Sequence, residues 1–161
     1  MLFRSTGARV TAVTADGVVL QVHSLQLPDQ PQRPVILCDP AAAREAVRKM
    51  SKLDVPFRVA LNTYGCEVLF DENNRVLDVV SEDMGNSAPP NATRRSVGIS
   101  DAAELANLVA GWKSNPPRGL RGVVWYRLPL ETDRRNWRWI TWRRVSEGVT
   151  PASDLRLEAR A

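Results

Sequence analysis

Three apolar segments that end in polar or aromatic side chains constrain the fold of this chain most strongly. They cover residues 18–22, 57–61 and 122–124 of the 161-residue sequence. The residues that follow them are His23, Asn62, Thr63, Tyr64, Trp125, Tyr126 and Arg127. Apolar runs without alternation are typical of buried parallel strands, whose carboxyl ends meet at one edge. The sequence therefore predicts that these tips converge on a common site.

Predicted helices separate the strands. Asp39 before Pro40 is the pattern of an N-cap with proline in the first turn, and residues 41–53 place apolar side chains on one face. Ser100 is expected to cap a second helix that runs to Trp112. Helices that alternate with apolar strands indicate a mostly parallel α/β sheet.

A β-hairpin is predicted between the first two helices. Residues 67–70 and 75–80 alternate in polarity on either side of residues 71–74, whose asparagines tolerate positive φ. A loop rich in serine, proline and asparagine is expected to follow, over residues 85–95.

The aromatic and basic segment after Pro129 has two interpretations. We favour a loop to Ile140, followed by a short helix with Thr141 as N-cap and Gly148 at its end. The alternative is one continuous helix over residues 131–147.

The length predicts a single domain over residues 1–161, and 43% hydrophobic residues suffice for its core. No run is long or apolar enough to span a bilayer, and residues 1–9 contain no apolar stretch of signal-peptide length. We therefore expect a cytoplasmic protein without a membrane partner.

The chain is basic, with a net charge of +4 and a pI near 9.6. Only Lys49, Lys52 and Lys113 are lysines, so arginine dominates the 22 basic residues, as codon bias in a GC-rich genome would produce. The arginines are scattered except in residues 134–144. This distribution indicates composition rather than polyanion binding, and nucleic acid is not the expected partner.

Neither a metal site nor a cofactor is expected. Cys38 and Cys66 lie far apart, and His23 is the only histidine, which is too few soft ligands for structural zinc. We interpret both cysteines as small buried thiols in a reducing compartment. The sequence also lacks a Gly-x-Ser-x-Gly elbow, a P-loop and a Gly-x-Gly-x-x-Gly fingerprint, which argues against esterases, NTPases and dinucleotide enzymes.

Three motifs carry a resemblance to a known family. Residues 19–25, 56–65 and 122–129, the last followed by Asp133 and Asn136-Trp137, occur in the order found in bacterial proteins known only as a domain of unknown function. The chain resembles the C-terminal half of that family, from about Val18 to Arg156. It departs from the family pattern at Asn62 and Ile140, where proline is usual.

The resemblance implies a fold. Members of the family are similar to eight-stranded β/α (TIM) barrels reminiscent of glycoside hydrolases. We therefore expect an α/β fold in the form of a partial (half) β/α barrel, with parallel core strands and a β-hairpin excursion. Half a barrel leaves two open strand edges and an uncovered apolar face. Such a chain is expected to pair with a second copy or to belong to a longer gene product.

The resemblance also suggests chemistry. Glycoside hydrolases use two carboxyl groups that flank the scissile bond. Glu82, with Asp83 as its alternative, and Asp133 are the best catalytic pair near the strand tips. The expected saccharide-binding residues are His23, Asn62, Tyr64, Trp125, Tyr126, Arg127, Asn136 and Trp137.

Several of these residues also have a purely structural interpretation. His23 suits general acid-base work but also a hydrogen-bonded structural position. Arg127 suits a carboxylate clamp or an internal ion pair. The tryptophans suit sugar stacking or ordinary packing, and packing is favoured for Trp112 and Trp142.

We therefore expect a carbohydrate-related protein, although absence of half the barrel argues against catalysis by this chain. The first alternative is a non-catalytic interaction module that completes its sheet with a partner. A less favoured alternative is a single-stranded nucleic-acid binder that uses the arginines and tryptophans of residues 134–144.

Overall fold

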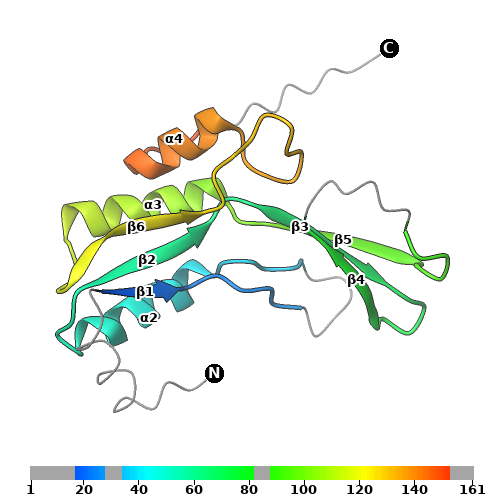
Figure 1. Ribbon diagram of the computed structural model, residues 1–161, viewed down its shortest axis with the longest axis horizontal. Coiled ribbons are helices and arrows are strands. Elements are labelled where there is room, and N and C mark those ends of the chain that lie inside the picture. Colours follow the sequence, from blue (N-terminus) through cyan, green and yellow to red (C-terminus); the bar gives the residue numbers. More distant parts are fainter. Residues whose placement is uncertain (1–16, 28–33, 82–87, 153–161) are drawn as a thin grey trace.

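The computed structural model describes residues 17–27, 34–81 and 88–152, which form two three-stranded sheets and three helices (Figure 1). The elements are β1 (Val18–Gln21), α2 (Pro40–Ser51), β2 (Phe57–Asn62), β3 (Gly65–Phe70), β4 (Val76–Val80), β5 (Arg94–Ile99), α3 (Ala102–Ser114), β6 (Leu120–Tyr126) and α4 (Trp139–Glu147). The sheets lie end to end, because β2 runs into β3 through only Thr63 and Tyr64.

The first sheet is parallel, as predicted. Its strand order is β1-β2-β6, with Val18 opposite Phe57 on one side and Asn62 opposite Tyr126 on the other. All three strands therefore end at the same edge. The fold is mixed α/β, and the described strands do not close into a barrel.

Helices cover one face of this parallel sheet. Alternate residues of β2, such as Val59 and Leu61, pack with apolar residues of α2 and α3, while α4 adds Val145. On the opposite face, which we call the open face, the edge strands expose Val19 and Val124. The central strand β2 is buried on both faces apart from one residue, so the uncovered apolar face expected of half a barrel is confined to the edge strands β1 and β6.

The second sheet is antiparallel, with strand order β4-β3-β5. The predicted hairpin is confirmed as β3 and β4, and Asn74 in its turn has a φ of 60°. The prediction of a loop through Arg95 was wrong at its end, because β5 begins at Arg94 and pairs with β3. Its Val97 and Ile99 are exposed, so backbone pairing stabilises β5 without the apolar pattern that reveals a buried strand.

The first helix has its predicted N-cap but ends at Ser51 and not at Leu53. Asp39 accepts hydrogen bonds from the backbone N–H groups of Ala41 and Ala42, and apolar residues face the core. The predicted cap of the second helix was wrong. Asp101, and not Ser100, accepts from the N–H groups of Ala103 and Glu104. Ser100 is buried and bonds elsewhere.

The last helix is short, as favoured, but its start was mispredicted. It begins at Trp139 and not after Thr141, and its N-cap Arg138 makes no side-chain capping bond. It ends at Gly148, which has a φ of 78°, as predicted. The continuous helix from residue 131 is wrong, since residues 127–138 form a loop. No helix in the described ranges is long and apolar enough to cross a membrane.

Candidate functional site

Three aromatic rings meet where the parallel strands end. His23 follows β1, Tyr64 follows β2 and Tyr126 ends β6. The centroid of the His23 ring lies 6.0 Å from the ring centroid of each tyrosine, and the two tyrosine centroids are 5.9 Å apart. The rings of His23 and Tyr126 are nearly parallel, while Tyr64 meets both at its edge. Segments distant in sequence thus build one aromatic cluster.

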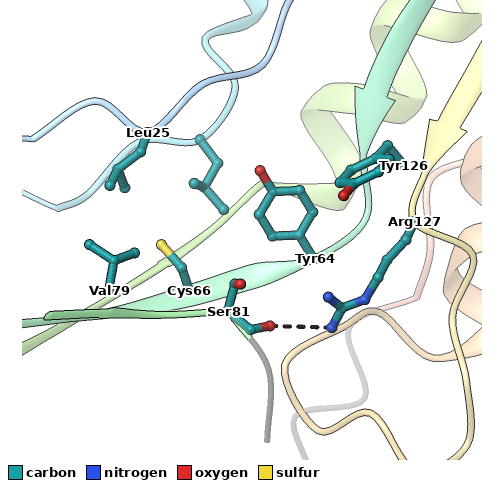
Figure 2. A pocket seen from close by; sticks show the side chains of 8 residues that line it. Leu25, Tyr64, Cys66, Val79, Ser81, Tyr126 and Arg127 are labelled. Atoms are coloured by element: carbon teal, nitrogen blue, oxygen red, sulfur yellow. Dashed lines mark hydrogen bonds between the residues drawn. The ribbon is translucent and has the colours of Figure 1, made fainter. Parts of the chain in front are cut away.

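A pocket of about 250 Å³ adjoins this cluster, and we call it the sheet-edge pocket. It is lined by Leu25, Leu37, Tyr64, Cys66, Val79, Ser81, Tyr126 and Arg127. Figure 2 shows the two tyrosines and Arg127 on one side, with Leu25, Val79 and Cys66 on the other. One wall is thus aromatic and polar, and the other is mainly apolar.

Backbone hydrogen bonds hold the strand tips together. The N–H of Thr63 donates to the carbonyl of Tyr126 at 3.0 Å, and the Thr63 hydroxyl donates to the carbonyl of Arg127. Tyr64 forms an isolated antiparallel bridge with Asn136, in the loop before α4. Tyr64 and Tyr126 are therefore positioned by the main chain of neighbouring segments.

Arg127 forms an ion pair with Asp133. Its Nε lies 3.0 Å from Oδ2 of Asp133, and Nη2 also contacts that oxygen. Nη2 donates to the carbonyl of Ser81 at 3.2 Å as well, which is the dashed line in Figure 2. The interpretation of Arg127 as half of an internal ion pair is thus confirmed.

The surroundings of Asp133 keep it ionised. Burial raises the pKa of its carboxyl group, but hydrogen bonds from Arg127 and from the backbone N–H of Arg135 outweigh burial and lower the pKa below its usual value. The second bond joins Oδ1 to that N–H at 3.0 Å. Both carboxylate oxygens are therefore engaged by neighbours.

His23 is buried between the two tyrosines. Burial lowers the pKa of its imidazole, so the ring is neutral at pH 7. Its Nδ1 has no hydrogen-bond partner among the described residues. His23 does not line the sheet-edge pocket, and its neutral ring can accept or donate a hydrogen bond at this buried nitrogen, depending on its tautomer.

Asn62 and Trp137 lie beneath the site. The amide of Asn62 donates to the carbonyl of Tyr64 at 2.9 Å and accepts from the Ser100 hydroxyl at 2.8 Å. The indole N–H of Trp137 donates to the carbonyl of Ser100 at 3.3 Å, and both residues are buried. They support Tyr64 and do not line the pocket.

Trp125 faces away from the pocket. Successive strand residues point to opposite faces, so Trp125 packs with the helical core while Tyr126 lies on the open face. Its ring lies 6.2 Å from that of Trp137.

Asn136 lines a different hollow, together with Asp133. Glu82, the other predicted catalytic carboxylate, and its alternative Asp83 lie outside the described residues.

The sequence prediction did not include five residues that line the pocket. They are Leu25, Leu37, Cys66, Val79 and Ser81. Cys66, Val79 and Ser81 belong to the hairpin or directly follow it, and the direct passage from β2 into β3 brings them to the strand tips. Leu25 and Leu37 lie in the segment between β1 and α2. Cys66 is buried and free, as predicted, and burial raises the pKa of its thiol.

Comparison with known protein families identifies the family of this chain. A model described as Domain of unknown function (DUF3142) matches residues 4–131. The chain belongs to the DUF3142 family. This confirms the expected membership of an uncharacterised family, and the DUF3142 match includes every residue of the sheet-edge pocket. It ends before Asp133 and α4. No curated protein and no solved structure matches this DUF3142 chain.

Proposed function

We propose that the sheet-edge pocket binds a single saccharide unit, with the ring of Tyr126 as its stacking platform. The observation that carries this proposal is the exposure of Tyr126, which is 59% exposed although its ring stacks on His23 and borders a pocket. A large aromatic side chain held open at a strand tip offers a flat apolar face to a ligand.

The size and polarity of the pocket support a small hydroxylated ligand. Pockets for drug-sized molecules start at about 300 Å³. A volume of about 250 Å³ therefore suits one ring. The hydroxyl of Tyr64, Ser81 and the guanidinium of Arg127 offer hydrogen bonds, and the neutral imidazole of His23 lies behind them.

Saccharide binding is the first part of the proposed function, and hydrolysis is the second. Glycoside hydrolysis needs two carboxyl groups about 5 to 5.5 Å apart for retention or about 6.5 to 9.5 Å apart for inversion. Asp133 is already paired with Arg127, so catalysis by Asp133 requires that a substrate displace this bond. Glu82 remains the proposed partner of Asp133. The proposal includes kinship with glycoside-hydrolase-like β/α barrels, which the three parallel strands with helices on one face support.

Saturation-transfer NMR and calorimetry with a panel of monosaccharides and short oligosaccharides test the binding proposal. We expect at least one sugar to bind the chain, and Tyr126→Ala to weaken that binding at least tenfold because the stacking face is lost. Trp139→Ala is the matched control, since Trp139 is 54% exposed but lies outside the pocket. Absence of binding across the panel, or equal losses in both variants, would contradict the proposal.

A second function, as an interaction module, is favoured by the open face of the parallel sheet. Among the described strands, β1 and β6 each pair on one side only. Val19 and Val124 expose apolar surface between these edges. Strand edges and apolar faces of this kind invite further strands. We propose that a second copy, or a further part of a longer chain, completes this sheet.

A further inference from the structure

A basic and apolar surface lies over α4 and the loop that precedes it, at the top of the molecule in Figure 1. Residues 134–144 include five arginines and three tryptophans but no acidic residue. The loop encloses a hollow of about 860 Å³ that shares no lining residue with the sheet-edge pocket. This surface is therefore separate from the proposed saccharide site.

Large apolar side chains are exposed on this surface. Leu130 is 66%, Trp139 is 54% and Ile140 is 57% exposed. Leu130 and Trp139 line the same hollow, and Ile140 follows Trp139 in the first turn of α4. Exposed apolar groups gathered in one place mark a site of contact with a partner.

Arginines surround these apolar side chains. Arg134 and Arg138 line the hollow together with Leu130 and Trp139, and both are exposed. On α4, Arg143 lies three residues after Ile140 and therefore on the same side of the helix. Val145, in contrast, is buried against the core. We name Leu130, Arg134, Arg138, Trp139, Ile140 and Arg143 the arginine-tryptophan surface.

Among the described residues, acidic side chains offset this positive charge only in part. Glu131 lines the hollow, and Glu147 lies 3.4 Å from Arg143. Both members of the second pair are more than half exposed, so the pair is weak and can exchange for another anion. Asp133, which also lines the hollow, is neutralised by Arg127.

We propose that the arginine-tryptophan surface binds the surface of a bilayer that contains anionic lipids. Trp139, Ile140 and Leu130 enter the boundary between head groups and acyl chains, where an indole ring is favourable. The guanidinium groups of the surrounding arginines contact the lipid phosphates, which match their fork geometry. Such peripheral binding needs no spanning helix. The sequence-based expectation of no membrane partner considered spanning segments only.

The exposed aliphatic side chains favour a membrane over single-stranded nucleic acid. Binding to single strands relies on several aromatic faces along a basic groove. Here Trp137 is buried, and the ring of Trp142 lies 4.4 Å from that of Trp139, so only Trp139 offers a large exposed ring. Leu130 and Ile140 contribute nothing to base stacking but contribute directly to insertion.

Co-sedimentation of the full chain with vesicles tests this proposal. Vesicles of phosphatidylcholine with about one third phosphatidylglycerol supply the anionic surface, and pure phosphatidylcholine is the neutral control. We expect binding to the anionic vesicles only, with release in high salt. The single substitutions Arg138→Gln and Arg143→Gln should each lower the partition coefficient about fivefold. Leu130→Ser with Ile140→Ser should lower it further and abolish quenching by bromine-labelled lipid.

Matched variants separate this surface from general effects. Arg75→Gln and Arg121→Gln, made singly, each remove the same charge elsewhere, and Val97→Ser with Ile99→Ser removes exposed apolar groups from β5. All of these control variants should bind as the unsubstituted chain does. Equal losses in controls and test variants overturn the proposal, as does absence of vesicle binding by the unsubstituted chain. Preferential binding of a random single-stranded oligonucleotide that ignores Leu130→Ser and Ile140→Ser would overturn it in favour of nucleic acid.

Discussion

The ion pair between Arg127 and Asp133 fixes the loop beside the sheet-edge pocket. Only 8% of the Asp133 side chain is exposed, and its two oxygens bond to Arg127 and to the N–H of Arg135. A partly buried pair of this kind costs more to break than a surface pair, because the remaining charge loses its partner.

We predict that Asp133→Asn lowers the free energy of unfolding at pH 7 by about 2 kcal/mol. The folded pKa of Asp133 lies below its ordinary value of 3.8, so its stabilisation is present above that value and is lost as the pH falls through the folded pKa. Denaturant titrations from neutral to acidic pH measure both effects. Asp54→Asn is the control, because the Asp54–Arg118 pair is largely exposed and should contribute within about 0.5 kcal/mol.

A second pH dependence belongs to His23. Burial holds its folded pKa below the unfolded value of 6.5, so the unfolded chain binds the proton more readily. Stability should therefore be complete above pH 6.5 and fall as the pH drops below it, by up to about 1.4 kcal/mol per pH unit. In His23→Gln this dependence should disappear. A slope that persists between pH 6.5 and 5 in the variant would assign it to another group.

At the scale of elements, two glycines differ in whether the backbone and its surroundings can accept a larger side chain. Gly148 ends α4 with a φ of 78°, and a Cβ there would lie 3.0 Å from Cα of Ala110 in α3. Gly111 lies inside α3, and a Cβ there would meet nothing within 4 Å. The same substitution should therefore have opposite effects at these two positions.

Gly148→Ala is expected to lower the free energy of unfolding by about 1 to 2 kcal/mol, because alanine resists positive φ and crowds α3. Gly111→Ala is expected to raise it by up to about 1 kcal/mol, because alanine is the better helix former. Thermal and urea unfolding of both variants compare the effects directly. Destabilisation by Gly111→Ala would contradict the open space beside that position.

Elements were predicted well where local chemistry decides them. Asp39 and Pro40 define the start of α2, and Asn74 allows the turn of the hairpin. The errors arose where distant partners compete. Ser100 is as good a cap as Asp101 in sequence, but its hydroxyl bonds to Asn62, 38 residues away. Likewise, the sequence of β5 lacks the apolar pattern of a buried strand, and β5 forms because its backbone pairs with β3.

At the scale of the whole molecule, the open face of the parallel sheet predicts association. Light scattering after size exclusion should show a concentration-dependent dimer if a second copy completes the sheet. Val124→Lys should then favour the monomer, because it places a charge on that face, whereas Val97→Lys on β5 should not. A monomer at all concentrations would exclude the second copy as the partner.

The site was predicted in part from the sequence. Convergence of His23, Tyr64 and Tyr126 follows from parallel strands and is seen in their ring contacts. Trp125 and Trp137 also looked suited to ligands, but the pleat turns Trp125 toward the helices, and Trp137 is buried. An aromatic residue at a strand tip has two possible faces, and only the register of the sheet selects one.

The sequence by itself determined the three parallel strands, the hairpin and the direction in which the strand tips point, because apolar runs, caps and turn residues act through near neighbours. The tertiary structure alone decided that the described helices, α2, α3 and α4, lie on the same face of the parallel sheet. It also placed Ser81 and Cys66 beside Tyr64 and joined Arg127 to Asp133. These arrangements depend on contacts between residues that are distant in the chain, and such contacts leave no local pattern in the sequence.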